Sequence, residues 1–407
     1  MNKQVKKLLY AILLYPLYII SKIIPKSDNV WIFGAWYGNR YSDNTAYLFE
    51  YVNREKVGID AIWLSKKEEI VSKIRSRGFR AYNKNSIFGF WYGCRAVITF
   101  INSGYNDVNI YAIGKSIKVQ LWHGIPLKKI KYDDTINENR YHNPVYRNIK
   151  SILLIIFPFL NEKWDFIISS SDEVTKRLSS AFRVKKNKII ESGYPRMDII
   201  LSPNKEYLDP FQIYQVGKDI EKIILYAPTH RKEGFGGKDL FDSMDFSKFN
   251  DFLVRKNVML LVKMHYYHEL INNYLFNRSL SNIIYLKEND VPDINHLLPF
   301  IDVLISDYSG VLLDYLILNR PIICTSFDLE IYIKQDRELY EDYDKTVKGI
   351  NCMNWCEVQD QLQNILSGKD LSINLRTEML QRFFHYHDKN NCKRIVDTVT
   401  NYLSRSS

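Results

Sequence analysis

Cysteine is scarce in this sequence, and its placement excludes several classes of protein. The 407 residues include five cysteines, an odd number scattered along the chain. Cys352 and Cys356 lie four positions apart, which is not the spacing of a zinc knuckle. The pattern therefore predicts no disulfide framework and is typical of a protein from a reducing, cytosolic compartment. The cysteines are Cys94, Cys324, Cys352, Cys356 and Cys392.

The N-terminal apolar run is too short to cross a bilayer. The uncharged stretch Leu8–Ile20 has thirteen residues, whereas a spanning helix needs about 20. Five lysines and no acid accompany it within residues 1–26, and Ser21–Pro25 offers no small-residue cleavage site. We interpret residues 1–27 as a basic amphipathic helix, peripheral on the anionic cytoplasmic face of a bacterial membrane. A signal anchor or an ordinary docked helix is the alternative, and Ile152–Leu160 is either a second membrane-facing helix or core.

Signatures of nucleic-acid binding and of metal binding are missing as well. The formal net charge of +10 favours acidic partners, but neither zinc-finger spacing nor an RNA-binding aromatic motif accompanies it. Anionic lipid and phosphorylated substrates therefore rank above nucleic acid, which we do not expect as a partner. No strand pattern precedes Asp342–Asp344, the one Asp-x-Asp pattern, so we interpret it as a solvated loop. We predict neither a metal nor a cofactor.

Strand and helix patterns alternate through most of the chain, which predicts an α/β protein. Short β-branched runs such as Val30–Gly34 and Val303–Ser306 are followed by segments of helical periodicity. Repeated βαβ units imply largely parallel, doubly wound sheets. The polar, proline-bearing stretch Ser202–Lys218 separates two such series. We therefore predict a GT-B fold, with two Rossmann-like domains and a central cleft. The predicted divisions are the N-terminal segment 1–27, a first domain 28–201, a linker 202–221, a second domain 222–375 and a C-terminal helical segment 376–407.

Three predicted strands of the second half end in polar or cationic residues. In open α/β sheets, ligands bind in the crevice outside the carboxyl ends of the strands. Hydroxyl and cationic side chains donate to anions, and a helix beginning at Ser309-Gly310 adds free backbone N–H groups. We therefore predict a phosphorylated ligand here, with an ordinary turn capped by Asp307 as the alternative. The candidate residues are Thr229, Arg231, Lys263, His265, Asp307, Ser309 and Gly310.

The first half contributes one comparable strand end. Lys118–Trp122 is predicted as a strand, followed by His123 and Gly124 and by a loop with Lys128 and Lys129. A histidine with an ordinary pKa near 6.5 can accept a proton from a hydroxyl at cytosolic pH, which makes His123 a candidate general base. A capping or core histidine is the alternative, and taken in isolation the residue favours it.

A series of short motifs occurs in order between Val30 and Val399. They read SDNTAYLFEYV, WHGIPLKKI, WDFIISSSDEVTKRLSSAF, ESGYPRMD, LYAPTHR, KMH, SDYSGVLLDYLILNRPII, DLEIY and HYHDKNNCKRIVD. Together they resemble the CDP-glycerol glycerophosphotransferase family of teichoic acid and capsule synthesis. The resemblance implies a GT-B fold, peripheral membrane attachment and transfer of an alditol phosphate from a CDP-alditol to a hydroxyl of an undecaprenyl-type, lipid-linked acceptor. It makes the first domain the acceptor domain and the second the CDP-alditol-binding domain.

The resemblance also implies roles for particular residues. His123 matches the family's proposed base, and His265 matches a second catalytic histidine that contacts the donor phosphate. The residues implied on the donor side are Thr229, Arg231, Lys263, Asp307, Ser309 and Gly310. The residues implied on the acceptor side are Gly124, Lys128, Asp43 and Asn44.

Four positions depart from the family pattern. Gly310 stands where a second serine is usual, so one hydroxyl contact to phosphate is missing while the backbone N–H remains. Tyr266, His230 and Ile125 replace a proline, a tryptophan and a threonine that are common in the family. The core chemistry survives these changes, but they bear on the choice of alditol and on the affinity for the donor.

The function that we predict is in-line attack of an acceptor hydroxyl on the β-phosphate of CDP-glycerol or another CDP-alditol, with CMP as the leaving group. His123 removes the hydroxyl proton. Three alternatives stay open: a phosphotransferase that uses CDP-ribitol, a GT-B glycosyltransferase that attacks carbon of a nucleotide sugar, and a non-catalytic nucleotide-binding scaffold. Because a sequence of this length leaves no room for a large extra domain, we expect the enzyme to add one or a few alditol phosphate units rather than to build a long polymer.

Overall fold

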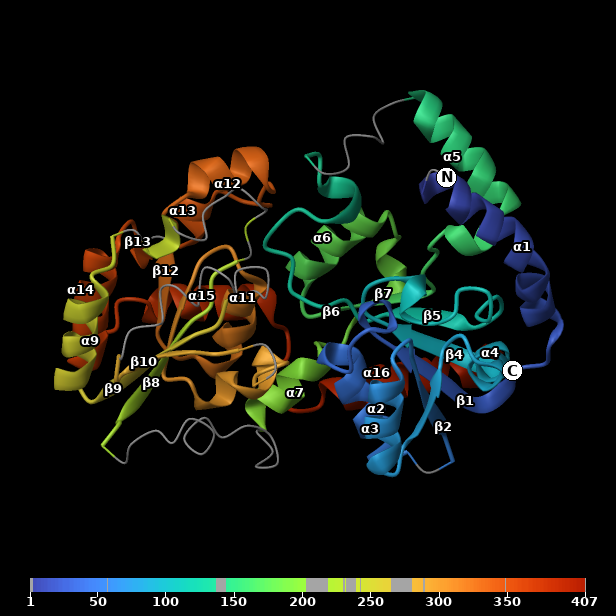
Figure 1. The fold of residues 1–407 in the computed structure, drawn as a ribbon, viewed down its shortest axis with the longest axis horizontal. Helices are drawn as coiled ribbons and strands as arrows, with labels where there is room; N and C mark the ends of the chain where they lie inside the picture. Colours follow the sequence, from blue (N-terminus) through green and yellow to red (C-terminus); the bar gives the residue numbers. More distant parts are fainter. Residues whose placement is uncertain are drawn as a thin grey trace.

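The structure, a computed structural model, contains two α/β domains, each built around one sheet (Figure 1). Most of the predicted linker lies outside the described residues, as do His230, His265 and Tyr266. The structure describes residues 3–56, 58–136, 144–202, 219–229, 231, 239–241, 243–264, 280–287, 290–347 and 349–406.

The first domain has a seven-stranded sheet with the order β3-β2-β1-β4-β5-β6-β7. All of the pairings described between these strands are parallel, as β-branched and aromatic runs buried on both faces predict. The strands are β1 (Ser27–Gly34), β2 (Asp60–Ser65), β3 (Arg80–Asn83), β4 (Ala96–Ile101), β5 (Ile117–Gln120), β6 (Phe166–Ser169) and β7 (Ile189–Glu191). The helices are α1 (Lys3–Ile23), α2 (Asp43–Glu55), α3 (Glu68–Ser76), α4 (Ile87–Arg95), α5 (Pro144–Ile156), α6 (Asp172–Phe182) and α7 (Pro195–Leu201).

The second domain has a six-stranded parallel sheet with the order β10-β9-β8-β11-β12-β13. Its strands are β8 (Lys222–Tyr226), β9 (Val258–Val262), β10 (Ile283–Tyr285), β11 (Val303–Ser306), β12 (Ile322–Thr325) and β13 (Asn351–Cys352). Its helices are α9 (Phe246–Arg255), α11 (Gly310–Tyr315), α12 (Leu329–Gln335), α13 (Tyr343–Thr346), α14 (Trp355–Leu366) and α15 (Ile373–Phe383). The prediction of two parallel-sheet α/β domains is confirmed.

The C-terminal segment, predicted as one helical stretch, is two helices. Helix α15 ends at Phe383, residues 384–390 are not helical, and the chain continues as α16 (Asn391–Ser406). Helix α16 lies against the first domain, where Asp397 pairs with Lys56 at 3.3 Å and the ring of Tyr402 lies 4.9 Å from that of Phe166. The chain therefore crosses back to the first domain at its end (Figure 1).

Helix α1 runs without interruption through Pro16. Its inner face contributes Ala11 and Tyr18 to a small apolar cluster with Phe157 and Phe159. Its outer face leaves apolar side chains in solvent, with Leu13 71% exposed. Among the residues that the structure describes, no helix combines the length and the apolar character that crossing a membrane requires. One side of helix α1 thus packs against the first domain, and the other side exposes apolar side chains to solvent.

Backbone contacts join the two domains beside the carboxyl ends of their strands. The loop after β5 meets the segment after α12, where the Lys129 N–H donates to the Glu338 carbonyl oxygen at 2.8 Å and the Tyr340 N–H donates to the Leu127 carbonyl oxygen at 3.2 Å. An isolated antiparallel bridge pairs Lys128 with Leu339 between them. These contacts hold the two sets of strand ends around one cleft.

Candidate active site

A cleft of about 590 Å³ lies between the domains and is lined by both of them. The first domain contributes Trp36, which follows β1, and His123, which follows β5. The second domain contributes Thr229 after β8, Lys263 after β9 and Ser309 after β11. Carboxyl ends of parallel strands from two sheets thus open into one space, the position where α/β proteins bind ligands.

His123 is held by a short, tightly fixed segment. Strand β5 ends at Gln120, two residues earlier than predicted, and Trp122 then adopts a left-handed φ of 51°. Such a conformation costs a bulky residue on the order of 1–3 kcal/mol and persists only where its surroundings fix it. The Asn44 side-chain amide donates to the Trp122 carbonyl oxygen at 2.9 Å, and the Gln120 side chain accepts from the Trp122 N–H at 2.9 Å. Asn44, expected on the acceptor side, is buried and supports the backbone directly before the histidine.

Aromatic rings and cations surround the His123 imidazole. Its ring centroid lies 4.1 Å from the ring of Trp122 and 4.9 Å from that of Trp36. Enclosure in the cleft, together with the positive charges of Arg196 and Lys131, lowers the pKa of His123 to about 3. The imidazole is therefore neutral at cytosolic pH and has a lone pair with which to accept a proton. An anionic ligand in the cleft would raise this pKa toward the range in which a base is effective.

The side of the cleft formed by the second domain offers hydroxyl and cationic groups. Thr229 is buried, and its Oγ1 finds no hydrogen-bond partner within the described part of the chain. Lys263 and Ser309 line the same wall, and Ser309 caps α11 by accepting from the Val311 N–H at 3.4 Å. At Gly310, a Cβ atom would meet only a carbonyl oxygen at 4.0 Å. Space therefore does not exclude the serine that the family usually has at that position.

Arg231 and Asp307 lie beneath the cleft wall rather than in it. The Arg231 guanidinium donates to Asp307 at 2.8 Å and to the two carboxylate oxygens of Asp328 at 2.6 and 2.8 Å. It also donates to the Thr229 carbonyl oxygen at 2.7 Å, and Asp307 accepts from the Thr229 N–H at 2.8 Å. The expectation that Arg231 contacts the donor phosphate directly therefore does not fit this arrangement, because its donors are engaged in fixing the Thr229 backbone.

Lys128 and Gly124, both expected on the acceptor side, occupy different surroundings. Lys128 lines the cleft, and its ammonium lies 5.9 Å from the ring of Tyr332 in the second domain. Burial lowers the pKa of Lys128 to about 8, which Asp307 opposes. This lysine therefore extends toward the donor side. Gly124 is not among the described residues that line the cleft, and no described atom lies within 4 Å of where its Cβ would be.

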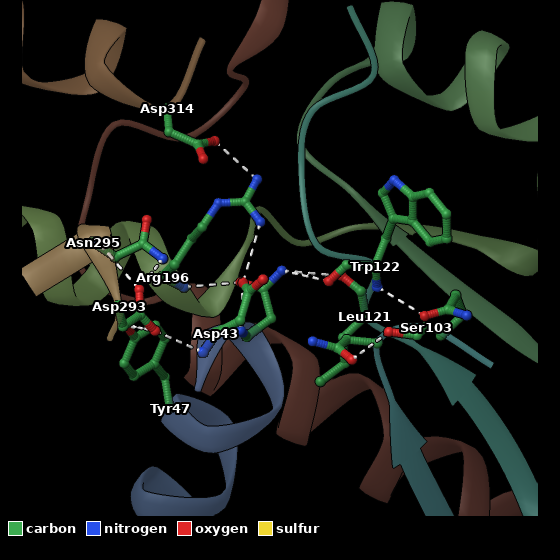
Figure 2. Close-up of polar contacts among 12 residues, drawn as sticks. Asp43, Tyr47, Ser103, Leu121, Trp122, Arg196, Asp293, Asn295 and Asp314 are labelled. Carbon is green, nitrogen blue, oxygen red and sulfur yellow. Dashed lines mark hydrogen bonds and ion pairs between the residues drawn. The ribbon is translucent and has the colours of Figure 1, made fainter. Parts of the chain in front are cut away.

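A buried cluster of one arginine and several carboxylates closes the other end of the cleft (Figure 2). Arg196 on α7 lies 3.5 Å from Asp43 and donates to Asp314 on α11 at 2.8 Å. The Asp43 N–H, at the start of α2, donates to Asp293 of the second domain at 2.8 Å. Burial raises the pKa of Asp43 to about 7, and Asp293 and Asp314 act in the same direction against Arg196. Sequence reasoning included Asp43 but missed Arg196, although the ESGYPRMD motif contains it directly after β7.

The described residues contain no group of three or more histidine, cysteine or carboxylate side chains that could hold a metal ion. Asp342 of the Asp-x-Asp pattern caps helix α13 by accepting from the N–H groups of Asp344 and Lys345. The carboxylate therefore has a structural role at a helix start.

The fold and the cleft define a GT-B-like transferase whose donor carries phosphate, with hydroxyl and cationic groups on one domain facing a neutral histidine on the other. The chain belongs to the CDP-Glycerol:Poly(glycerophosphate) glycerophosphotransferase family, whose model matches residues 16–401. The resemblance seen in the motifs is thereby confirmed.

Known proteins place the chain within teichoic acid synthesis. It is 28% identical over 405 residues to the teichoic acid glycerol-phosphate transferase of Staphylococcus aureus, a match that covers 97% of this chain and 99% of that protein. It is 32% identical over 345 residues to a teichoic acid poly(glycerol phosphate) polymerase of Bacillus spizizenii, covering 81% and 82%. The solved structure of the wall teichoic acid polymerase TagF has the same fold, with a TM-score of 0.75 at 24% identity over 94% of this chain and 90% of that one. The chain is thus an enzyme of the CDP-glycerol glycerophosphotransferase family and is similar to teichoic acid glycerol-phosphate transferases and polymerases.

Proposed function

We propose that this enzyme transfers glycerol phosphate from CDP-glycerol to a hydroxyl at the end of a lipid-linked saccharide or of a short polyol-phosphate chain, and releases CMP. One observation carries the proposal: a neutral histidine of the first domain and the phosphate-side donors of the second domain line the same cleft. A base for a hydroxyl and a cradle for a pyrophosphate are the two parts that such a transfer needs.

The step is an in-line displacement at the β-phosphorus. The acceptor oxygen forms a new bond to phosphorus while His123 takes its proton. The bond between the β-phosphorus and the bridging oxygen breaks, and its electron pair leaves with CMP. Because phosphoryl transfer depends mainly on positioning and on stabilising charge on the phosphoryl oxygens, the enzyme needs no covalent intermediate.

We assign the phosphate contacts to Thr229, Lys263, Ser309 and Lys128, because all four line the cleft. Arg231 and Asp307 act one layer further back, since they hold the Thr229 backbone in place. The negative charge of the donor also has a second effect: it raises the pKa of His123, so the base becomes effective when the donor is bound. His265, which the family pattern assigns to the donor phosphate, lies outside the described residues.

We further propose that the enzyme works as a peripheral protein on the cytoplasmic face of the membrane. Helices α1 and α5 lie side by side at one end of the first domain (Figure 1), joined by the cluster around Tyr18 and Phe157. Both leave apolar side chains exposed, including Leu13 at 71% and Ile155 at 77%. Together with the lysines of the N-terminus, this face suits an anionic lipid surface, from which the acceptor would reach the cleft.

The experiment that tests the proposed transfer gives purified enzyme a choice of donors. Enzyme, anionic vesicles and a lipid-linked disaccharide that ends in glycerol phosphate are incubated separately with CDP-glycerol, CDP-ribitol and a UDP-sugar. Mass spectrometry of the lipid should show additions of one glycerol phosphate unit with CDP-glycerol only. A mass increase of one ribitol phosphate or one sugar residue would assign the enzyme to one of the alternative reactions, and the number of units added separates priming from polymerisation.

A further inference from the structure

The buried cluster at the end of the cleft is assembled from both domains. Asp43 begins α2 and Arg196 lies on α7 of the first domain, whereas Asp314 lies on α11 of the second. All three line the cleft. The guanidinium donates to Asp314 at 2.8 Å and lies 3.5 Å from Asp43 (Figure 2). A ligand at this end of the cleft would touch both domains at once.

Arg196 has hydrogen-bonding capacity that the described residues do not use. Its side chain is 1% exposed, yet its Nε and Nη1 donate no hydrogen bond to any residue that the structure describes. Buried donors without acceptors are unfavourable, most of all on charged groups, so such atoms in a cleft wall point to acceptor atoms of a ligand.

The cluster is directly connected to the catalytic histidine. The Arg196 backbone N–H donates to the Asn44 side-chain oxygen at 3.1 Å, and the same amide holds the Trp122 carbonyl oxygen at 2.9 Å, next to His123. The arginine is also close enough to lower the pKa of His123. A group bound between Arg196 and the carboxylates therefore lies beside the base.

The charges at this end of the cleft favour hydroxyl groups over phosphate. Asp43 and Asp314 flank the Arg196 guanidinium, and Asp293 accepts from the Asp43 N–H, whereas Lys128 and Lys263 stand elsewhere in the lining. A guanidinium already paired with two carboxylates offers a phosphate little net positive charge. A hydroxyl, in contrast, can donate to a carboxylate and accept from a guanidinium N–H at the same time. Adjacent hydroxyls of a polyol match alternating carboxylate and guanidinium groups.

We propose that Asp43, Arg196 and Asp314 bind the terminal polyol of the acceptor, so that one of its hydroxyl groups is presented to His123 and the next is held by the cluster. The inference rests on the proposed function, because it concerns the acceptor of that transfer. It makes this cluster the determinant of acceptor specificity, and it separates the cleft into a cationic donor end and an acidic acceptor end.

The test compares two acceptors that differ by one hydroxyl. The first is a lipid-linked disaccharide that ends in glycerol phosphate, and the second ends in 1,3-propanediol phosphate, which keeps the attacking hydroxyl but lacks its neighbour. Wild-type enzyme should prefer the first by about tenfold or more in kcat/KM, the size of one hydrogen bond to a charged group. In Asp314→Asn and in Asp43→Asn this preference should fall toward one, with a raised KM for the first acceptor and a KM for CDP-glycerol within about twofold of wild type.

Asp198→Asn is the matched control, because Asp198 is a half-buried carboxylate on the same helix as Arg196 but caps α16 by accepting from the N–H groups of Asn391 and Cys392. It should keep the preference for the first acceptor. A merely structural role for the cluster would lower kcat/KM for both acceptors equally and leave their ratio unchanged, which would overturn the inference. A KM for CDP-glycerol that rises as much as the acceptor KM would overturn it too, since the cluster would then bind the donor's glycerol.

Failure of the proposed function has a different signature, because wild-type enzyme would then release no CMP with either acceptor. Calorimetry shows separately whether the enzyme binds CDP-glycerol. Circular dichroism and thermal unfolding establish that each variant is folded. Asp43 and Asp314 come from different domains, so one variant suffices for the test if the other does not fold. An unchanged ratio of kcat/KM for the two acceptors, in a folded variant of either residue, contradicts the inference.

Discussion

The backbone directly before His123 is fixed, and its imidazole ring is neutral. Both features depend on residues that are far away in the sequence. The Asn44 amide fixes the carbonyl oxygen of the preceding residue, and Arg196 adds positive charge beside the ring. Histidine at the end of a strand is by itself an ambiguous signal. In this cleft its surroundings favour the protonation state that a general base requires.

Replacing His123 by alanine should therefore separate catalysis from donor binding. Turnover should fall by about 10²–10⁴, the usual contribution of a general base, while the Kd for CDP-glycerol stays within about twofold because His123 is not one of the proposed phosphate contacts. Steady-state kinetics and calorimetry measure the two quantities. His387→Ala, which removes a histidine outside the cleft lining, is the control and should leave both unchanged. Near-normal turnover in a folded His123→Ala enzyme would exclude the histidine as the base.

The depressed pKa of His123 also predicts a pH dependence of folding stability. Its folded value of about 3 lies below the unfolded value near 6.5, so the unfolded chain binds the proton first as the pH falls. The contribution of this group is present in full above pH 6.5 and is lost below it, by up to about 1.4 kcal/mol per pH unit. The free energy of unfolding should thus fall more steeply between pH 7 and pH 5 for wild type than for His123→Ala. Parallel curves in denaturant titrations would show that enclosure does not shift this pKa.

Thr229→Val tests the unpartnered hydroxyl on the donor side. Valine preserves the shape of threonine, and no described residue hydrogen-bonds to Oγ1, so folding stability should change little. A lost hydrogen bond to phosphate should weaken CDP-glycerol binding by about tenfold, as measured by calorimetry. Unchanged affinity would place the phosphate elsewhere along the wall.

Arg231→Ala should act on stability rather than directly on the ligand. It leaves the fully buried carboxylate of Asp307 without its charged partner, a loss of about 3–5 kcal/mol in the free energy of unfolding. Chemical denaturation measures this directly. Wild-type stability together with loss of donor affinity would instead restore Arg231 to the role of a phosphate ligand.

At the scale of secondary-structure elements, helices α1 and α5 carry the surface that we propose binds the membrane. Helix α1 is docked through Tyr18, so its deletion would expose core apolar surface as well as remove a membrane contact. Substitutions on the outer face avoid that ambiguity. The double change Leu13→Asp and Ile155→Asp should reduce sedimentation with anionic vesicles by about tenfold or more while thermal unfolding is unchanged, because a charge replaces each exposed apolar contact.

Leu371→Asp provides the control for membrane binding, since Leu371 is 61% exposed but lies in the second domain. Binding by this variant and by wild type should weaken together as salt screens the N-terminal lysines. Full sedimentation of the double variant would mean that another surface anchors the protein.

At the scale of elements, hydrophobic periodicity in the sequence predicted long helices and central strands well. It predicted poorly how those elements contact one another. Strand β11 has the bounds that its apolar pattern indicated, because such a pattern reports burial of one segment against its own domain. The edge strands β10 and β13 are three and two residues long, too short for a periodic signal. The break between α15 and α16 was missed because it is set by the return of α16 to the first domain.

The candidate site shows the same division. The sequence identified His123, Thr229 and Ser309 because polar residues directly follow buried strands. It could not separate Arg231, which supports the wall, from residues that line it, and it missed Arg196. Those distinctions depend on Asp328 and Asp314, ion-pair partners more than ninety positions away in the chain, and no local pattern reports such pairings.

At the scale of the whole molecule, the two domains divide the chemistry between them. The loop after β5 and the segment around Leu339 join them beside the cleft. The acidic end of the cleft adds a second connection, because Asp293 of the second domain accepts from the first N–H of α2. The histidine and the hydroxyl and cationic side chains of the second domain therefore line one cleft, in which, by the proposed mechanism, a hydroxyl on one wall reaches phosphorus on the other.

The identity of the released nucleotide tests this account most directly. Enzyme, CDP-glycerol and the acceptor that ends in glycerol phosphate are incubated, and the nucleotides are separated by ion-exchange chromatography while the lipid product is weighed by mass spectrometry. Attack on phosphorus predicts CMP in a one-to-one ratio with glycerol phosphate units added to the acceptor. Release of CDP together with addition of glycerol that carries no phosphate would show attack on carbon, and it would contradict the proposed mechanism.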